Sequence, residues 1–208
     1  MPVLTPAVSI LMPVRNGVDT LDRAIRGIMA QTTDDWELVV VNDGSTDGTA
    51  SVLTELAEID RRIRVLTIPP LGIVSALQRG CDACRGEWIA RMDADDWMHP
   101  ERIRSQLAHA ERNPDLGVVS CLVGYGGAER GYGAHVDWLN TMIDPEIIGL
   151  RRFIESPVAH PSVMFRRNLL ETRGGYREGD FPEDYELWLR WMDAGVRFGK
   201  VPGWLLEW

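Results

Sequence analysis

The sequence lacks the features that would mark a membrane-spanning or exported protein. No apolar run approaches the roughly 20 residues that a bilayer-spanning helix needs. The amino terminus has no basic segment followed by an apolar one, so no signal peptide is predicted. These absences favour the cytoplasm and leave peripheral attachment to the inner face of the membrane open.

Cysteine is scarce, and acidic residues outnumber basic ones. The chain has three cysteines and no second Cys or His pair at zinc-ligand spacing, so Cys81 and Cys84 are interpreted as buried thiols rather than a metal or redox pair. With 22 basic and 31 acidic residues the formal net charge is -9, which argues against broad binding to nucleic acid. The net negative charge does not exclude a nucleotide ligand, because a bound metal can invert the local charge.

What the chain does have is an alternation of short apolar runs with amphipathic stretches, in 208 residues that fit one domain. Strands are predicted over 7–12, 37–41, 63–68, 88–92 and 116–123, and helices over 20–31, 73–84, 100–112 and after a cap at Asp47. This order predicts an α/β fold with a mostly parallel sheet covered by helices on both faces. The second half is less regular, with a glycine-rich loop over 125–133, helices over 144–153 and 185–194, and a strand over 162–165.

Acidic side chains follow two of the predicted strands. Asp93, Asp95 and Asp96 come directly after the strand at 88–92, and Asp43 follows the strand at 37–41. Three neighbouring carboxylates repel one another, and a divalent cation such as magnesium or manganese, which prefers oxygen ligands, relieves that repulsion. Because open α/β sheets bind ligands outside the carboxyl ends of their strands, both acidic segments are expected at one crevice.

Four blocks of sequence carry a family resemblance. They are residues 8–16 (VSILMPVRN), 40–49 (VVNDGSTDGT), 89–96 (IARMDADD) and 182–188 (PEDYELW). Together, and in this order, they resemble the family 2 glycosyltransferases, whose catalytic domain has the nucleotide-diphospho-sugar transferase fold called GT-A. The resemblance implies one GT-A domain over 1–208, with a nucleotide-sugar-binding half at 1–123 and an acceptor and catalytic-base half at 124–208.

The resemblance implies a metal-dependent, inverting transfer of a single sugar, of hexosyl type, from a nucleotide-diphospho-sugar to an acceptor hydroxyl. The leaving diphosphate gains negative charge, which a metal stabilises as a Lewis acid. By the resemblance, Asp95 is the ligand of Mn²⁺ or Mg²⁺, and Asp93 reaches the ribose or the metal. Asp43 accepts a hydrogen bond from the ring N–H of the base, which backbone groups near Pro13 and Val14 flank.

The acceptor hydroxyl needs a base to take its proton, and Asp184, with Glu183 beside it, resembles the general base of the family. Arg15 is expected either to contact phosphate or to pair with a surface carboxylate. The acceptor is a glycan, a lipid-linked molecule or a small molecule. The setting that the resemblance implies is the synthesis of cell-surface polysaccharide or of another glycoconjugate.

The same acidic residues also have structural interpretations. Asp95 and Asp96 suit a turn or helix cap before Pro100, Asp43 suits an Asp-Gly turn, and Asp184 suits the first turn of a helix. His160 suits a contact with phosphate or acceptor, although a hydrogen-bonded structural role is favoured. Trp188 and Trp191, one helical turn apart, are expected to pack against the sheet.

Two departures from the family pattern bear on the function. Gln78 stands where relatives usually have Asn for a donor contact, and Arg79 is the residue that could replace it. The Q-x-x-R-W signature of the processive, polymerising members is absent, which favours transfer of one sugar. The chain ends among apolar residues at Trp208, which often marks a missing segment. In relatives, residues beyond this point often close the active site. A non-catalytic module that binds a sugar nucleotide is the alternative function. A nucleotidyltransferase is disfavoured, because 13–17 is not the glycine-rich basic loop of that class.

Overall fold

The computed structural model describes residues 5–127 and 130–208. Four parallel strands form the first half of its sheet, in the order β3-β2-β1-β4. They are β1 (Val8–Val14), β2 (Trp36–Asp43), β3 (Ile63–Ile68) and β4 (Trp88–Arg91). Each lies within a residue or two of its predicted range. Every residue of β1 and β2 is buried, as expected of central strands covered on both faces.

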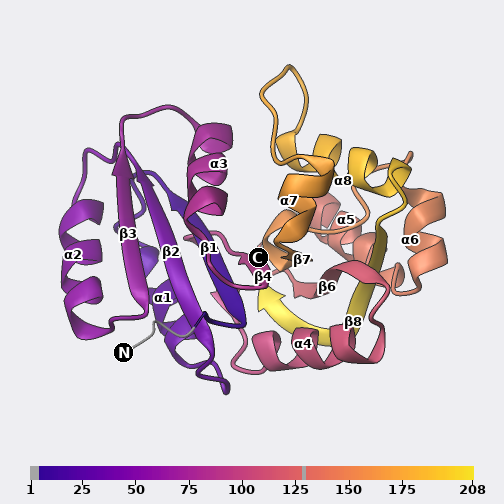
Figure 1. Cartoon of the computed structure of the whole chain (residues 1–208), viewed down its shortest axis with the longest axis horizontal. Helices are drawn as coiled ribbons and strands as arrows, with labels where there is room; N and C mark the ends of the chain where they lie inside the picture. Colours follow the sequence, from indigo (N-terminus) through magenta and orange to yellow (C-terminus); the bar gives the residue numbers. More distant parts are fainter. Residues whose placement is uncertain (1–4, 128–129) are drawn as a thin grey trace.

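Helices connect these strands, and Figure 1 shows this half of the molecule in indigo and magenta. They are α1 (Leu21–Met29), α2 (Thr49–Ile59) and α3 (Ile73–Ala83), whereas α4 (Arg102–Arg112) follows β4 and leads into the rest of the sheet. Helix α3 lies very close to the sheet, because a Cβ at Gly80 would come within 2.1 Å of Leu11 on β1 and 3.0 Å of Val41 on β2. Glycine at this position therefore lets the last turn of α3 pack closely against β1 and β2.

The second half extends the same sheet with a mixed pattern, giving eight strands in the order β3-β2-β1-β4-β7-β6-β8-β5. β7 (Met164–Arg166) is antiparallel to both β4 and β6 (Leu116–Gly124). β8 (Arg197–Glu207) runs parallel to β6, and the short β5 (Trp97–Met98) pairs antiparallel with β8. The α/β architecture with helices flanking the sheet is confirmed, with the parallel arrangement concentrated in the first half.

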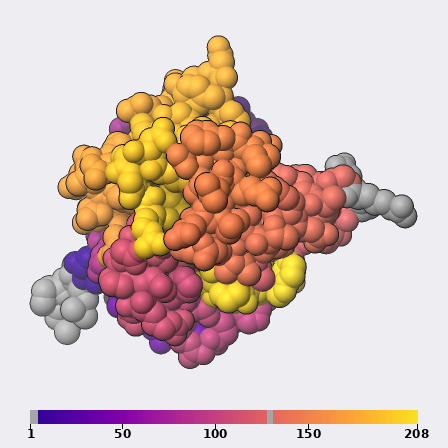
Figure 2. Space-filling model, turned by 90° about the vertical axis from the view of Figure 1, so that its right-hand side faces the viewer, coloured from indigo at the N-terminus to yellow at the C-terminus, as the bar shows by residue number. Residues whose placement is uncertain are grey.

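Helices cover the second half of the sheet. They are α5 (Arg130–Thr141), α6 (Pro145–Arg151), the short 3₁₀ helix η1 (His160–Ser162), α7 (Asn168–Arg173) and α8 (Glu183–Asp193). Figure 2 turns the right-hand side of Figure 1 toward the viewer and shows the orange segment around α6 across this face, with yellow β8 residues beside it. No helix among residues 5–127 and 130–208 is both long and apolar enough to cross a bilayer.

Several elements differ from the sequence prediction. The loop predicted over 125–133 is wrong from residue 130 onward, where α5 begins, and residues 128 and 129 of it lie outside the described residues. Gly131 and Gly133 lower helix propensity, but buried Val136 and Leu139 anchor the helix by packing. Strand β8, the longest in the sheet, was not predicted. Its pairing with β6 shifts register around Pro202 and Gly203, which interrupts the pattern that a strand prediction needs.

A buried polar network holds α4 against the middle of the sheet. The Arg102 side chain is fully buried and donates from Nη2 to the carbonyl oxygen of Arg91 at 3.0 Å, at the end of β4. Its Nε donates to Oε1 of Gln106, whose amide nitrogen donates to the carbonyls of Val119 on β6 and Ser162 in η1, at 2.7 and 2.9 Å. Three segments from both halves of the chain are therefore tied to one helix, next to the acidic residues that follow β4.

Candidate active site

Two adjacent cavities lie at the carboxyl ends of β1, β2 and β4. One, of about 230 Å³, is lined by the end of β1, by Asp43 at the end of β2 and by the start of α3. The other, of about 350 Å³, is lined by the end of β1 and the following loop, and by the segment after β4 that includes Asp93 and Asp95. Pro13, Val14 and Arg15 line both cavities. The parallel order β2-β1-β4 explains this placement, since it brings three strand ends to one edge.

Asp43 is only 4% exposed, and its two carboxylate oxygens accept hydrogen bonds from distant backbone. The N–H of Leu71 donates to Oδ1 at 2.7 Å, and the N–H of Gly72 donates to Oδ2 at 3.0 Å. The local turn instead belongs to Asn42, whose Oδ1 accepts from the N–H of Ser45. Asp43 thus fixes the segment that leads into α3, and its remaining lone pairs leave acceptor capacity at the cavity.

The acidic segment after β4 is partly neutralised by the protein itself. Arg91, 4% exposed, forms an ion pair with Asp93. Asp96 is 3% exposed, and its Oδ2 has no hydrogen-bond partner among the described residues. Burial, aided by the charges of Asp93 and Asp95, raises the pKa of Asp96 to about 8. A protonated Asp96 therefore relieves the repulsion that three carboxylates would otherwise create.

The residues that could hold a divalent cation are Asp93 and Asp95, which share one cavity wall. Within 5–127 and 130–208, no group of three or more His, Cys, Asp or Glu side chains is gathered as a ready-made metal cluster. A magnesium-type site, in which one or two carboxylates and the phosphates of a substrate share the metal, would require no more than these two side chains from the protein. The carboxylate oxygens of Asp93 and Asp95 suit such an ion, whereas Asp96 does not line this cavity.

Asp184 lies in the first turn of α8 and is half-buried. Burial raises its pKa, and the neighbouring Glu183 adds to that increase, while the charge of Arg91 opposes it. A raised pKa makes this carboxylate a stronger proton acceptor. Asp184 lines neither of the two cavities, so the structure does not bring it together with Asp43, Asp93 and Asp95 around one cavity wall.

The other candidate residues have different surroundings. Arg15 is exposed, lines both cavities and makes no ion pair within the described residues, which leaves its guanidinium available to an anion. Gln78 donates from Nε2 to the carbonyl of Tyr176 at 2.9 Å, and Arg79 lines a separate cavity, so neither lines the two cavities described above. His160 is buried and bonded to Tyr176, in agreement with its favoured structural role.

Sequence reasoning overlooked two residues of this region, Arg91 and Tyr176. Arg91 lies at the end of the apolar run of β4, and a charged residue in a predicted buried strand was the signal that could have identified it. Tyr176 follows Gly174 and Gly175, and that glycine pair was the available signal of a specific turn before α8. Trp188 and Trp191 are fully buried, and Cys81 and Cys84 are buried free thiols, as predicted; Cys121 is a third buried thiol.

Comparisons with known proteins identify the family. The family model described as "Glycosyl transferase family 2" matches residues 9–174. An uncharacterized glycosyltransferase of Haemophilus influenzae is 29% identical over 194 residues, covering 88% of this chain and 59% of that protein. The O-antigen biosynthesis glycosyltransferase WbnJ of Escherichia coli is 29% identical over 205 residues, covering 96% of this chain and 78% of WbnJ.

A solved structure supports the fold independently. The mannosyltransferase PcManGT of Pyrobaculum calidifontis, in complex with GDP-Man and Mn²⁺, matches with a TM-score of 0.76 at 21% identity, covering 100% of this chain and 58% of that one. This chain therefore spans less than two thirds of the length of PcManGT and of the Haemophilus protein. Because the family match covers most of the chain and the architecture is the GT-A fold, the protein belongs to glycosyl transferase family 2, a family of enzymes.

Proposed function

We propose that this chain transfers one sugar from a nucleotide-diphospho-sugar to an acceptor hydroxyl, with inversion at the anomeric carbon and with a divalent cation on the donor diphosphate. The observation that carries the proposal is the pair of adjacent cavities that share Pro13, Val14 and Arg15. One contains Asp43, an acceptor for a base, and the other contains the carboxylates Asp93 and Asp95. The groups of a nucleotide-diphospho-sugar follow the same order, with a base at one end and a diphosphate beyond the ribose.

The base would occupy the cavity beside Asp43. Held by the N–H groups of Leu71 and Gly72, the carboxylate cannot turn away from the cavity, and it accepts the ring N–H of the base. Because the carboxylate is already fixed, little side-chain entropy is lost when the base binds. Pro13 and Val14 would cover the face of the base from the end of β1.

The diphosphate would occupy the second cavity, between Arg15 and the segment after β4. A bound Mn²⁺ or Mg²⁺ would supply Lewis-acid stabilisation of the departing diphosphate. Asp95 would be its ligand, with Asp93 contacting the ribose or the metal. Arg15, which is exposed and lines this cavity, would attract the phosphates with its positive charge. This attraction would offset the repulsion of the phosphates by a chain whose net charge is -9. The first half of the chain, 1–123, thereby binds the donor.

The second half, 124–208, would supply the proton acceptor. Asp184 takes the proton of the acceptor hydroxyl while the hydroxyl oxygen attacks the anomeric carbon from the face opposite the diphosphate. One carbon–oxygen bond forms and the bond to the diphosphate breaks, so the configuration inverts and the negative charge leaves with the diphosphate. The raised pKa of Asp184 favours this role, and such a base typically contributes about 10²–10⁴-fold to the rate.

The acceptor is proposed to be a glycan, lipid-linked or small-molecule hydroxyl in the synthesis of cell-surface polysaccharide or glycoconjugate. Support comes from the similarity to WbnJ, a glycosyltransferase of O-antigen biosynthesis. The donor-binding half is the better defined of the two, since both cavities are lined by residues before 100.

A donor panel tests the proposal directly. Purified protein is mixed with uridine, guanosine and thymidine diphospho-sugars, with Mn²⁺, Mg²⁺ or EDTA, and both the melting temperature and the release of nucleoside diphosphate are measured. We expect one donor to raise the melting temperature, since a ligand that binds only the folded state stabilises it, and to be turned over only with metal. Stabilisation by a donor without any release, with acceptor glycans present, would instead support a sugar-nucleotide-binding module.

A further inference from the structure

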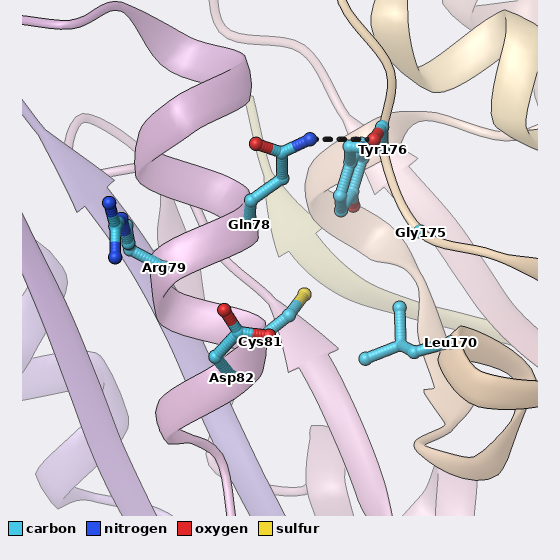
Figure 3. A pocket seen from close by; sticks show the side chains of 7 residues that line it. All are labelled: Gln78, Arg79, Cys81, Asp82, Leu170, Gly175 and Tyr176. Atoms are coloured by element: carbon cyan, nitrogen blue, oxygen red, sulfur yellow. Dashed lines mark hydrogen bonds between the residues drawn. The ribbon is translucent and has the colours of Figure 1, made fainter.

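The segment between α7 and α8 is hydrogen-bonded to α3. Gln78, on α3, donates from Nε2 to the carbonyl of Tyr176 at 2.9 Å, as the dashed line in Figure 3 shows. One turn earlier, Ser75 Oγ donates to Oε1 of Glu178 at 3.2 Å, in an exposed position. A cavity of about 400 Å³ lies beside the first of these bonds, between α3 and the residues around Tyr176. The donor-binding half therefore contacts the segment that leads directly to Asp184.

The side chain of Tyr176 continues this connection into the interior. Tyr176 is 3% exposed and His160 is 8% exposed, and Tyr176 Oη lies 2.8 Å from His160 Nε2. Burial raises the pKa of the Tyr176 phenol well above its usual value and lowers the pKa of His160 well below 6.5, so the phenol is protonated and the imidazole is neutral. The phenol has no other acceptor within the described residues, so its O–H donates to Nε2. The imidazole proton then resides on Nδ1.

His160 contacts α8 at two points. Its Nδ1 lies 3.9 Å from Oε1 of Glu183, the residue before Asp184, a separation longer than a direct hydrogen bond. Its ring meets the ring of Trp188 edge-on, with centroids 5.9 Å apart. Trp188 is fully buried one helical turn after Asp184, so the ring of His160 packs along the start of α8. The Nδ1–H tautomer places a positive hydrogen toward the Glu183 carboxylate.

We propose that Gln78, Tyr176 and His160 are positioning residues that fix the first turn of α8, and with it Asp184, relative to α3 and the donor cavity. None of the three lines either donor cavity, so they act through Asp184 rather than on the substrate. This inference rests on the proposed role of Asp184 as the base. It also gives Gln78 a function different from the donor contact that an Asn at this position would make.

The first test needs no substrate and uses the histidine tautomer. The chain has four histidines, so protein labelled with ¹⁵N-histidine gives few imidazole signals, and His160→Gln assigns the one of interest. We expect His160 to be neutral and protonated on Nδ1 between pH 6 and 8. Tyr176→Phe should convert this signal to a mixture of tautomers or to one that titrates. An Nε2–H tautomer in the wild type, or a signal that Tyr176→Phe leaves unchanged, would overturn the proposed connection.

The second test is kinetic and uses matched controls. Release of UDP and GDP is measured from UDP- and GDP-sugars with Mn²⁺ for Gln78→Met and Tyr176→Phe. Each should lower kcat about tenfold or more, because misplacing a catalytic group by about 1 Å costs on the order of 10²-fold, while KM for the donor changes less than twofold. Ser75→Ala removes the neighbouring bond between the same two segments, and Tyr185→Phe removes a hydroxyl bond from α8 to the carbonyl of Arg152. Both should retain wild-type kcat.

Failure of this inference and failure of the proposed function give different results. If Asp184→Asn is inactive but Gln78→Met and Tyr176→Phe both have the wild-type kcat, the positioning role is wrong and the base assignment stands. If Asp184→Asn keeps wild-type turnover, the proposed base is wrong. Equal losses in Tyr176→Phe and Tyr185→Phe would mean that any loosening of α8 lowers the rate, which would also refute a specific connection through His160.

Discussion

Replacing Asp43 by asparagine separates a structural role from a ligand-binding role at one position. The carboxylate accepts two backbone hydrogen bonds, from Leu71 at 2.7 Å and from Gly72 at 3.0 Å, and the residue is 4% exposed. Asparagine keeps one acceptor oxygen and turns a donor group toward the second N–H. One hydrogen bond to a charged acceptor is therefore lost, and such bonds contribute about 1.5–3 kcal/mol each.

This loss predicts a measurable change in stability. Taking about 2 kcal/mol, and a shift of roughly 2–4 °C per kcal/mol for a chain of this size, Asp43→Asn should lower the melting temperature by about 4–8 °C. The urea midpoint should fall by about 0.7 M if the dependence on urea is about 3 kcal/mol/M. Both measurements are made without ligand, so that they report only the link between Asp43 and the segment before α3.

Asp47→Asn is the matched control. Asp47 also accepts two backbone hydrogen bonds, from Thr49 at 3.0 Å and from Val18 at 3.3 Å, but it is exposed and lines neither donor cavity. Its replacement should change stability less, because water can take the place of an exposed acceptor. Equal stability of the two variants would refute the claim that Asp43 holds the start of α3.

Binding then decides the second role. At a temperature where both variants are folded, titration calorimetry with UDP and GDP in Mn²⁺ should show binding at least tenfold weaker for Asp43→Asn, with wild-type affinity for Asp47→Asn. A destabilised Asp43→Asn protein that binds nucleoside diphosphate normally would leave Asp43 with its structural role alone.

Three further predictions concern the carboxylates around Arg91. Asp184→Asn should lower turnover by at least about 100-fold while donor affinity stays within twofold, as measured by single-turnover kinetics and calorimetry; equal loss of both would contradict the base assignment. Asp95→Ala should abolish both activity and the stabilisation by Mn²⁺ in the presence of nucleoside diphosphate, and undiminished turnover with metal would contradict the ligand role. The pKa of Asp96 is raised to about 8, so the folded protein keeps this proton at pH values where the unfolded chain has lost it. Metal-free protein should therefore lose stability as the pH rises from about 4 through 8. Asp96→Asn should flatten that slope in urea unfolding, and an unchanged slope would mean that Asp96 is ionised in the folded state.

The first half of the chain was predictable because its signals are local. Strands such as β2 are continuous apolar runs, and the residue after each run marks the edge of the sheet, so Asp43 and Asp93 could be placed at one edge from sequence alone. The contacts between halves could not be predicted this way. The bond between Gln78 and Tyr176 joins residues 98 positions apart, and no periodicity indicates it.

The second half resisted prediction because packing there overrides local preference. Helix α5 contains two glycines near its start and forms on buried side chains further along, and β8 continues through Pro202 and Gly203 by shifting register against β6. Asp184 could be placed at a helix start from the sequence. Its distance from the donor cavity depends on the segment around Tyr176, whose path is set by tertiary hydrogen bonds.

The charge balance of the acidic segment shows where the argument from the sequence was incomplete. Three carboxylates after β4 were expected to require a cation, because they repel one another. The fold supplies two cations of its own, since Arg91 pairs with Asp93 and the buried Arg102 lowers the pKa of Asp96 against the effect of burial. Asp96 still has a pKa near 8, so these arginines offset only part of the repulsion. The segment can therefore fold without a bound cation, and under the proposed function the energy that a cation adds would be available for holding the donor diphosphate.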